Sequence, residues 1–203
     1  MAEELAVFVV DDDRAIRDSL TGLLEASGYR ARAYESAKAF LAGGELDSHG
    51  CVIADIRMPD MDGLELQAEM NARGSRLQVI VMTGHGDIPL AVRAMKAGAV
   101  DFLEKPYDTA VLLEAVRRAL SKPRDDERSP TEISPEARAQ LDSLTPRERE
   151  VLDMIVAGKL NKSIAYELSI SQRTVEVHRA RLMKKMGARN MAELMRMMLG
   201  APP

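Results

Sequence analysis

The stretch Val7-Phe8-Val9-Val10-Asp11-Asp12-Asp13 decides the fold, because four consecutive apolar residues run directly into three carboxylates. Two later runs end in a similar way: Cys51-Val52-Ile53-Ala54 stops at Asp55, and Val100-Asp101-Phe102-Leu103-Glu104 stops at Lys105. Short buried strands of a parallel sheet end at a common edge, where the ligands of such sheets bind. The pattern therefore predicts that residues far apart in the sequence meet in one acidic pocket that contains one cation.

Apolar runs alternate with stretches of helical period throughout the first 121 residues. We expect strands near residues 6–10, 31–34, 51–55, 78–82 and 100–103, and helices near residues 14–27, 36–43, 63–73, 88–97 and 108–121. Strand and helix repeated five times predict an α/β fold, a doubly wound five-stranded parallel sheet with helices on both faces.

The composition changes after residue 121. Residues 121–130 contain two prolines and no other apolar residue, which is typical of an exposed linker. The later residues show only helix starts, each with a capping side chain: Ser134-Pro135, Thr145-Pro146 with Glu148, Asn161 and Ser171. We therefore predict a first domain over residues 1–121, a linker and the start of a connecting helix over 122–140, and a small all-helical domain over 141–203.

Charge is divided unevenly along the chain, whose net charge is −4. Residues 1–121 hold 13 Lys and Arg against 20 Asp and Glu, whereas residues 143–203 hold 11 against 6. A basic tail behind an acidic front favours different partners for the two parts, with nucleic acid as a candidate for the tail. Solvated charged faces alone also produce such a division.

Several classes of protein are disfavoured by the composition. Cys51 is the single cysteine, so an internal disulfide is excluded, and the three scattered histidines argue against a zinc site. No apolar run approaches the roughly 20 residues of a membrane span, and the acidic N-terminus does not resemble a signal peptide. We expect a cytoplasmic protein that does not act at a membrane.

The predicted acidic pocket needs a counter-charge. Three carboxylates and one ammonium group sum to −2, which one Mg²⁺ would neutralise; the residues are Asp11, Asp12, Asp55 and Lys105. A cation there would also position a phosphoryl group for attack by a carboxylate. The hydroxyl of Thr83, after another apolar run, could bind a phosphoryl oxygen. Carboxylates after strands are often only helix caps, an interpretation that we prefer for Asp13.

Four segments resemble the signature segments of response-regulator receiver domains: Val9-Val10-Asp11-Asp12, Ile53-Ala54-Asp55-Ile56-Arg57-Met58-Pro59-Asp60-Met61-Asp62-Gly63, Met82-Thr83-Gly84 and Phe102-Leu103-Glu104-Lys105-Pro106. The resemblance covers residues 5 to 120 and implies the strand order 2-1-3-4-5. It implies that Asp55 accepts a phosphoryl group from a sensor histidine kinase.

The same resemblance implies roles for the neighbouring residues. Asp12, Asp55 and the backbone carbonyl of Arg57 would hold Mg²⁺, and Asp11 would act through water. Lys105 and Thr83 would grip the phosphoryl oxygens. Phe102 occupies the position of a rotating aromatic that acts as a switch together with Thr83. The Lys105–Pro106 peptide is expected to be cis. Arg57 and His85 occupy positions that tune the lifetime of the phosphoryl group.

The tail has the layout of a helix-turn-helix DNA reader, with residues 161–168 as one helix and residues from 172 onward as the next. Steps of 100° per residue place Val175, Arg179, Leu182 and Met186 on one face and a cationic set opposite. His178 lies near the buried face and is interpreted as structural. The expected DNA contacts are Lys162, Arg173, Thr174, Glu176, Val177, Ala180, Arg181 and Lys184.

Residues 144–152, 161–165 and 170–178 resemble the LuxR-type DNA-binding domain, so the whole chain is similar to the NarL/FixJ class and is closer to its FixJ branch. Many relatives carry lysine at the positions of Glu176 and Ala180, so the bases that they read do not transfer. The resemblance implies a transcription factor, not an enzyme, that forms a homodimer when phosphorylated and binds double-stranded promoter DNA. The dimer would use the face of helix 88–97 and strand 100–103, and the last helix would pair the DNA-binding units. RNA polymerase is a further expected partner.

Two other functions remain open from the sequence. A phosphoryl relay or sink would use the same receiver without DNA. An aspartyl phosphatase of the haloacid dehalogenase type also uses strand-end Asp, Thr and Lys with Mg²⁺. That family places its nucleophile first and has Thr or Val at the fifth place of the segment, where Asp11-Asp12-Asp13-Arg14-Ala15 has alanine. The order of the residues therefore argues against the phosphatase.

Overall fold

The computed structural model describes residues 5–84, 88–121 and 133–199. They form two compact units, one of residues 5–84 with 97–121 and one of residues 88–96 with 133–199. His85 and most of the predicted linker, residues 122–132, lie outside the described residues.

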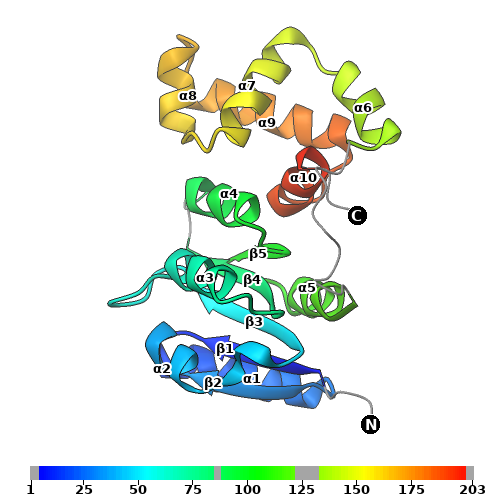
Figure 1. Cartoon of the computed structure of the whole chain (residues 1–203). Helices are drawn as coiled ribbons and strands as arrows, with labels where there is room; N and C mark the ends of the chain where they lie inside the picture. The colour runs from blue at the N-terminus through cyan, green and yellow to red at the C-terminus, as the bar shows by residue number, and fades with distance from the viewer. Residues whose placement is uncertain (1–4, 85–87, 122–132, 200–203) are drawn as a thin grey trace. The chain divides into compact units, whose positions relative to one another are not determined.

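A five-stranded parallel sheet with the order β2-β1-β3-β4-β5 forms the centre of the first unit (Figure 1). Its strands are β1 (Ala6–Val10), β2 (Arg30–Tyr34), β3 (Gly50–Asp55), β4 (Gln78–Thr83) and β5 (Asp101–Glu104). The helices between and after the strands are α1 (Arg14–Ala26), α2 (Ala37–Ala42), α3 (Gly63–Ala72), α4 (Ile88–Lys96) and α5 (Thr109–Ser121). The predicted fold class and strand order are confirmed, and only the short 3-10 helix η1 (Glu45–Asp47) was not anticipated.

Alternation along β1 shows why both faces of the sheet are covered. Val7 and Val9 belong to a core cluster that also holds Leu20 of α1 and Leu112 of α5. Phe8 points to the opposite face, where its ring centroid lies 5.7 Å from that of Phe40 in α2. Strands that are buried on both faces read as continuous apolar runs, which is the pattern seen in β1, β3 and β4.

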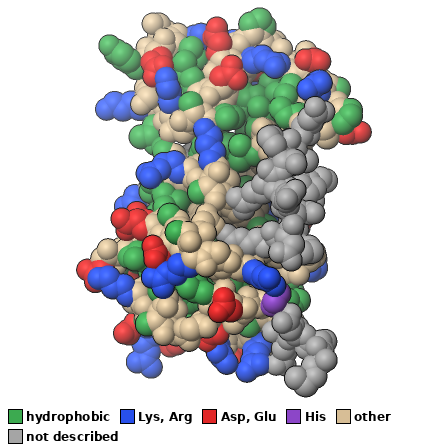
Figure 2. All heavy atoms as spheres, viewed as in Figure 1, with side chains coloured by type: hydrophobic (Ala, Val, Ile, Leu, Met, Phe, Trp, Pro, Cys, Tyr) green, Lys and Arg blue, Asp and Glu red, His purple; other side chains and the backbone are tan. Residues whose placement is uncertain are grey.

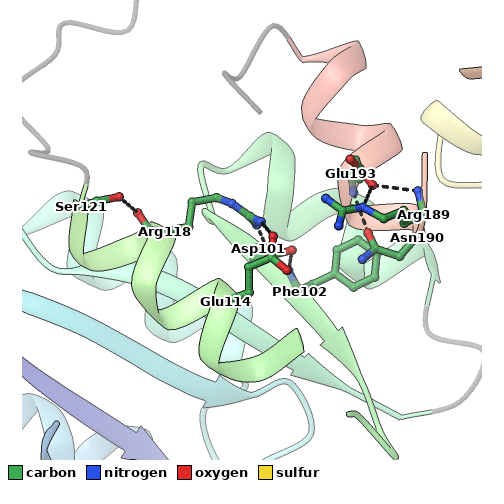
Figure 3. A network of polar contacts seen from close by, with 8 residues as sticks. All are labelled: Asp101, Phe102, Glu114, Arg118, Ser121, Arg189, Asn190 and Glu193. Atoms are coloured by element: carbon green, nitrogen blue, oxygen red, sulfur yellow. Dashed lines mark hydrogen bonds and ion pairs between the residues drawn. The ribbon is translucent and has the colours of Figure 1, made fainter. Parts of the chain in front are cut away.

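An ion pair joins the edge strand β5 to α5 (Figure 3). The Arg118 guanidinium lies 2.6 Å from Asp101 Oδ2 and 3.1 Å from Glu114 Oε1. The other oxygen of Asp101 accepts a hydrogen bond from the backbone N–H of Phe102 at 2.9 Å. The buried carboxylate is therefore satisfied on both sides, and β5 is tied to α5 next to Phe102.

The second unit contains the helices that follow the linker: α6 (Pro135–Asp142), α7 (Pro146–Val156), α8 (Asn161–Glu167), α9 (Gln172–Met186) and α10 (Met191–Met198). Their core includes Leu152, Ile164, Val175, Leu182 and Met186, all less than 1% exposed. Residues 133–199 contain no strand, as predicted.

The predicted caps hold with one exception. Ser134, Thr145 and Ser171 each accept a backbone hydrogen bond at the start of a helix, and Thr145 forms a complete capping box with Glu148. Asn161 was wrong as a cap, because Leu160 occupies the N-cap position of α8 and no side chain caps that helix. The amide oxygen of Asn161 accepts a hydrogen bond from Arg179 instead.

The environment of Glu148 makes the free energy of unfolding of the helical unit depend on pH in the acidic range. Its side chain is buried, and Lys185 Nζ lies 2.7 Å from its Oε2. This hydrogen bond, with that from the Thr145 N–H, lowers the pKa of Glu148 to about 2. Because the folded pKa lies below the unfolded value, the carboxylate stabilises the fold above about pH 4.5 and loses this contribution as the pH falls toward 2.

We expect Glu148→Gln to lower the free energy of unfolding by about 1–3 kcal/mol at pH 7, since it weakens a charge-assisted hydrogen bond. The difference from wild type should shrink steadily between pH 4.5 and pH 3. Urea unfolding at several pH values measures it. A difference that stays constant over this range would contradict the assignment, and Glu150→Gln, at an exposed position of the same helix, is the matched control.

Candidate functional site: a strand-end acidic cluster and a helix-turn-helix

Lys105 joins the ends of three strands. Its Nζ lies 2.7 Å from Asp55 Oδ1, after the buried part of β3, and 2.9 Å from Asp11 Oδ2, after β1. The Asp11 and Asp55 side chains are only 1% and 10% exposed. The structure thus brings together the three residues that the sequence placed at one edge of the sheet.

The segment after β1 is held by its own carboxylates. Asp11 Oδ1 accepts a hydrogen bond from the Asp13 N–H at 2.9 Å, and Asp13 Oδ1 accepts one from the Ala15 N–H at 2.8 Å. Asp13 is therefore the N-cap of α1, as predicted. Asp12 follows Asp11 at the same corner with an exposed side chain. The corner presents one carboxylate to Lys105 and the next one to solvent.

Close backbone packing positions Asp55. A Cβ at position 63 would lie 2.4 Å from the Asp55 carbonyl oxygen, so this site accepts only glycine without a shift of the backbone. The Gly63 N–H donates to the Ile56 carbonyl at 3.1 Å, and Asp62 and Glu65 form a capping box at the start of α3. The Arg57 N–H donates to Asp55 Oδ2 at 3.0 Å, while the Arg57 side chain is exposed. The Gly63 contacts thus fix the backbone at Asp55, and the Arg57 N–H orients its carboxylate.

Burial and the neighbouring charges act in opposite directions on the cluster. Burial raises the pKa of Asp55, although hydrogen bonding to Lys105 works against the rise. Burial alone would lower the pKa of Lys105, but hydrogen bonds to Asp55 and Asp11 outweigh it and raise the pKa. The raised pKa keeps the Lys105 ammonium group charged, so one cation faces the two carboxylates of the cluster.

The donor set suits a hard divalent cation by chemistry. Asp11, Asp12 and Asp55 supply carboxylate oxygens, and the backbone carbonyl of Arg57 follows Asp55 by two residues. Mg²⁺ prefers such oxygens and keeps several of its waters. Within the described residues, no three His, Cys, Asp or Glu side chains already stand together as a metal site. Asp12 is the exposed carboxylate of this set, whereas Asp11 and Asp55 are buried.

Two other predicted receiver residues lie at neighbouring strand ends. Thr83 is buried at the end of β4, and its hydroxyl donates to the Gly84 carbonyl at 3.1 Å. Phe102 pairs with Val81 across β4 and β5. The Lys105–Pro106 peptide is cis, as predicted. The structure places Thr83 at the same sheet edge as Asp55, with its hydroxyl bonded away from Lys105.

The helix-turn-helix of the second unit is formed by α8, the turn over residues 168–171 and α9. The predicted inward residues Val175, Leu182 and Met186 are fully buried, and Arg179 lies half-buried at the rim. The predicted DNA contacts that are exposed are Lys162, Arg173, Glu176, Val177, Ala180, Arg181 and Lys184. Thr174 is half-buried, with its hydroxyl 2.8 Å from that of Ser171 at the start of α9. The angular assignment of the two faces of α9 is confirmed.

Two arginines fix the ends of α8, and neither role was predicted. Arg179 Nη1 donates to Asn161 Oδ1 at 2.7 Å, which joins α9 to the first turn of α8. Arg147 Nη2 donates to the Leu168 carbonyl at 2.6 Å, which joins α7 to the C-terminal end of α8. Cations are favourable at a helix C-terminus. Such contacts have no local sequence signal, because each joins residues on different helices.

One histidine of the second unit was interpreted from the sequence as structural. His178 is half-buried, in keeping with a structural role, and its Nδ1 is a buried atom without a hydrogen-bond partner among the described residues.

Within the described ranges, no helix has the length and apolarity that crossing a membrane requires. Charged side chains of both signs are visible over the face shown in Figure 2.

Comparison with known proteins finds a matching family for each of two regions of the chain. Residues 7–117 match the response regulator receiver domain, and residues 142–198 match the bacterial regulatory proteins of the luxR family. The chain is 52% identical over 199 residues to the transcriptional regulatory protein FixJ of Azorhizobium caulinodans, which covers 98% of this chain and 94% of that protein. It is 46% identical to FixJ of Rhizobium meliloti, over 97% of this chain and 96% of the relative.

Solved structures agree with these matches. Full-length FixJ from B. japonicum aligns with a TM-score of 0.57 at 43% identity and covers 98% of both chains. The response regulator StyR aligns with a TM-score of 0.57 at 39% identity, over 96% of this chain and 98% of that one.

Proposed function

Because the chain belongs to the FixJ-type response regulators, two-component transcriptional regulators that join a receiver domain to a LuxR-type DNA-binding domain, we propose that phosphorylation of Asp55 controls its binding to promoter DNA. The observation that carries the proposal is the contact of Lys105 with both Asp55 and Asp11 at the edge of the sheet. We infer that the phosphoryl donor is a phosphohistidine of a sensor kinase. We propose that the domains are residues 1–121 and 141–203, joined by residues 122–140.

Asp55 is proposed as the nucleophile. One carboxylate oxygen of Asp55 forms a bond to phosphorus while the bond from phosphorus to the histidine nitrogen breaks, and the imidazole leaves with its electron pair and takes a proton. The Arg57 N–H holds the second oxygen of Asp55 in place during the attack. Lys105 follows the developing charge from the carboxylate to a phosphoryl oxygen, and the Thr83 hydroxyl turns from the Gly84 carbonyl to another.

Mg²⁺ would neutralise the phosphoryl oxygens when it is bound. Asp12, Asp55 and the Arg57 carbonyl would hold it, and Asp11 would act through a bound water. The composition of the corner supports this assignment, since three carboxyl groups, those of Asp11, Asp12 and Asp55, accompany the single ammonium group of Lys105. The exposed Arg57 side chain and His85 are proposed to influence how long the phosphoryl group persists.

The signal is proposed to leave the pocket through Thr83 and Phe102. Movement of the Thr83 hydroxyl toward the phosphoryl group opens space beside β4, into which the Phe102 ring on β5 turns. The receiver surface at β5 then forms a homodimer. Dimerisation raises the effective concentration of the second DNA-binding unit, so a paired site binds more tightly than a single half-site. We propose that α10 pairs the two DNA-binding units.

DNA is proposed to lie against the exposed face of α9. Arg173, Arg181 and Lys184 supply cations for phosphates, Val177 and Ala180 offer apolar contact to thymine methyl groups, and Glu176 accepts from a cytosine amino group. The protein would act on DNA in the cytoplasm, with RNA polymerase as a further partner.

Coupling between the two units gives the direct test. Treatment of the full chain with phosphoramidate and Mg²⁺ should shift it from monomer to dimer and tighten its binding to a paired site by about 10²-fold or more. Sedimentation and gel-shift titration on the same sample measure both. Phosphorylation without any change in DNA affinity would contradict the proposed control and would favour a phosphoryl relay or sink.

A further inference from the structure

Arg17 is a further cation beside the proposed phosphorylation site. It lies one turn into α1, half-buried, and its Nη1 donates to the backbone carbonyl of Asp11 at 2.7 Å. Asp11 is thereby held at three points, because its Oδ1 accepts from the Asp13 N–H and its Oδ2 from Lys105. The guanidinium is one hydrogen bond away from a residue that contacts Lys105, which in turn contacts Asp55.

The Asp11 carbonyl is the link between β1 and the acidic corner. The next residue is Asp12, whose exposed side chain is a proposed ligand of the cation. Fixing the carbonyl of Asp11 fixes the plane of the peptide that leads into Asp12. The direction in which the Asp12 side chain leaves the backbone therefore depends on the bond from Arg17.

Building on the proposed function, we propose that Arg17 is a positioning residue for phosphoryl transfer, which holds the Asp11–Asp12 peptide in the orientation that cation binding needs. Partners that orient metal ligands from behind typically change metal affinity by about 10- to 100-fold when they are removed. Arg17 acts on the backbone between two ligands, so we expect an effect near the lower end of that range.

The positive charge of Arg17 and its proposed positioning role predict opposite effects of Arg17→Ala on cation affinity. A positive charge beside the pocket disfavours a dication, so if charge were the main effect, Arg17→Ala would bind the cation more tightly. If orientation is the main effect, the same variant binds it more weakly. Arg14 separates the two effects, because it lies on the same helix, its side chain is 85% exposed, and it forms an ion pair with Asp18.

The experiment titrates Mn²⁺, which accepts the same oxygen ligands as Mg²⁺, into the unphosphorylated full chain and follows free Mn²⁺ by electron paramagnetic resonance. We expect Arg17→Ala to weaken Mn²⁺ binding about tenfold and to slow labelling by phosphoramidate and Mg²⁺ by a similar factor. Arg17→Lys, which keeps a charged donor, should recover part of both losses, and Arg14→Ala should stay within about twofold of wild type, as expected for an exposed charge. Because the phosphoryl donor is a small molecule, an effect of the substitution on kinase binding does not enter the measurement.

Other outcomes overturn the inference. Binding by Arg17→Ala that equals or exceeds that of wild type would show that the bond to Asp11 does not orient the site. If Arg17→Ala does not fold, as judged by urea unfolding, Arg17→Gln replaces it; this variant removes the charge and should bind Mn²⁺ less tightly than Arg17→Lys, and the reverse order would reject positioning. Failure of wild type itself to bind Mn²⁺ and to accept a phosphoryl group would reject the proposed function together with this inference.

Discussion

Asp55→Asn should abolish phosphorylation of the chain by its kinase and by phosphoramidate, with a loss of at least about 10³-fold that leaves no detectable label. An amide has nearly the size of the carboxylate but is not a nucleophile, so the substitution removes the reacting group with little change in packing. Loss of one charge leaves Lys105 paired with Asp11, which keeps the ammonium satisfied. We therefore expect the variant to fold and to behave as a permanently unphosphorylated protein.

Labelling with a ³²P donor, followed by hydroxylamine treatment to test for an acyl phosphate, measures this effect. The matched control is Asp13→Asn, which changes an exposed carboxylate in the acidic corner and preserves the cap of α1, because asparagine is an equally good N-cap. Label that survives Asp55→Asn would defeat the assignment. Turnover of phosphate esters that is lost in Asp11→Asn and kept in Asp55→Asn would instead support a phosphatase.

The double substitution Arg173→Ala with Lys184→Ala should weaken DNA binding by the phosphorylated chain by about 10- to 100-fold at physiological salt. Both side chains are exposed at opposite ends of the outward face of α9, about three turns apart, whereas Val175 and Leu182 of the same helix are buried in the core. The substitutions thus remove phosphate contacts without disturbing the fold. The dependence of log K on log salt should become shallower by about two.

Gel-shift or anisotropy titration over a range of salt concentrations measures both effects, with duplexes selected by phosphorylated wild type from a random pool. Arg76→Ala with Arg138→Ala is the control, since both cations are exposed, both lie outside α8 and α9, and the same number of charges is removed. Unchanged affinity in the α9 variant would show that DNA lies elsewhere. If phosphorylated wild type selects no DNA, the chain is better explained as a relay or sink.

The sequence predicted the strands and helices of residues 1–121 to within one residue at each end and the starts of the later helices, because the signals for them are local. Residues 6–10 were predicted as a strand and observed as β1, since the run Val7 to Val10 has no polar break and Asp13 supplies a cap for the next helix. The capping box of Thr145 and Glu148 and the two faces of α9 follow from spacings of three and four residues. Such signals require only the geometry of one turn.

The sequence predicted hydrogen-bond partners less well where a polar side chain can bond either to nearby residues or to distant ones. Asn161 has the residue type of a cap, yet its amide oxygen accepts from Arg179, 18 positions away. No local pattern gives a partner to Arg17 or Arg147, and only the fold shows that they donate to backbone carbonyls outside their own helices. A side chain that can satisfy its hydrogen bonds in several ways is assigned by the packing around it.

The acidic pocket shows the same division between sequence and structure. Apolar runs that end in Asp11, Asp55 and Lys105 determined that these residues lie at one edge of a parallel sheet, because every such strand ends on the same side. The tertiary structure decided that Lys105 contacts both carboxylates, 94 positions from Asp11, that Asp12 faces solvent and that Arg17 holds the intervening backbone. Periodicity and capping act within a few residues, whereas these contacts depend on how strands and helices pack, which no local pattern encodes.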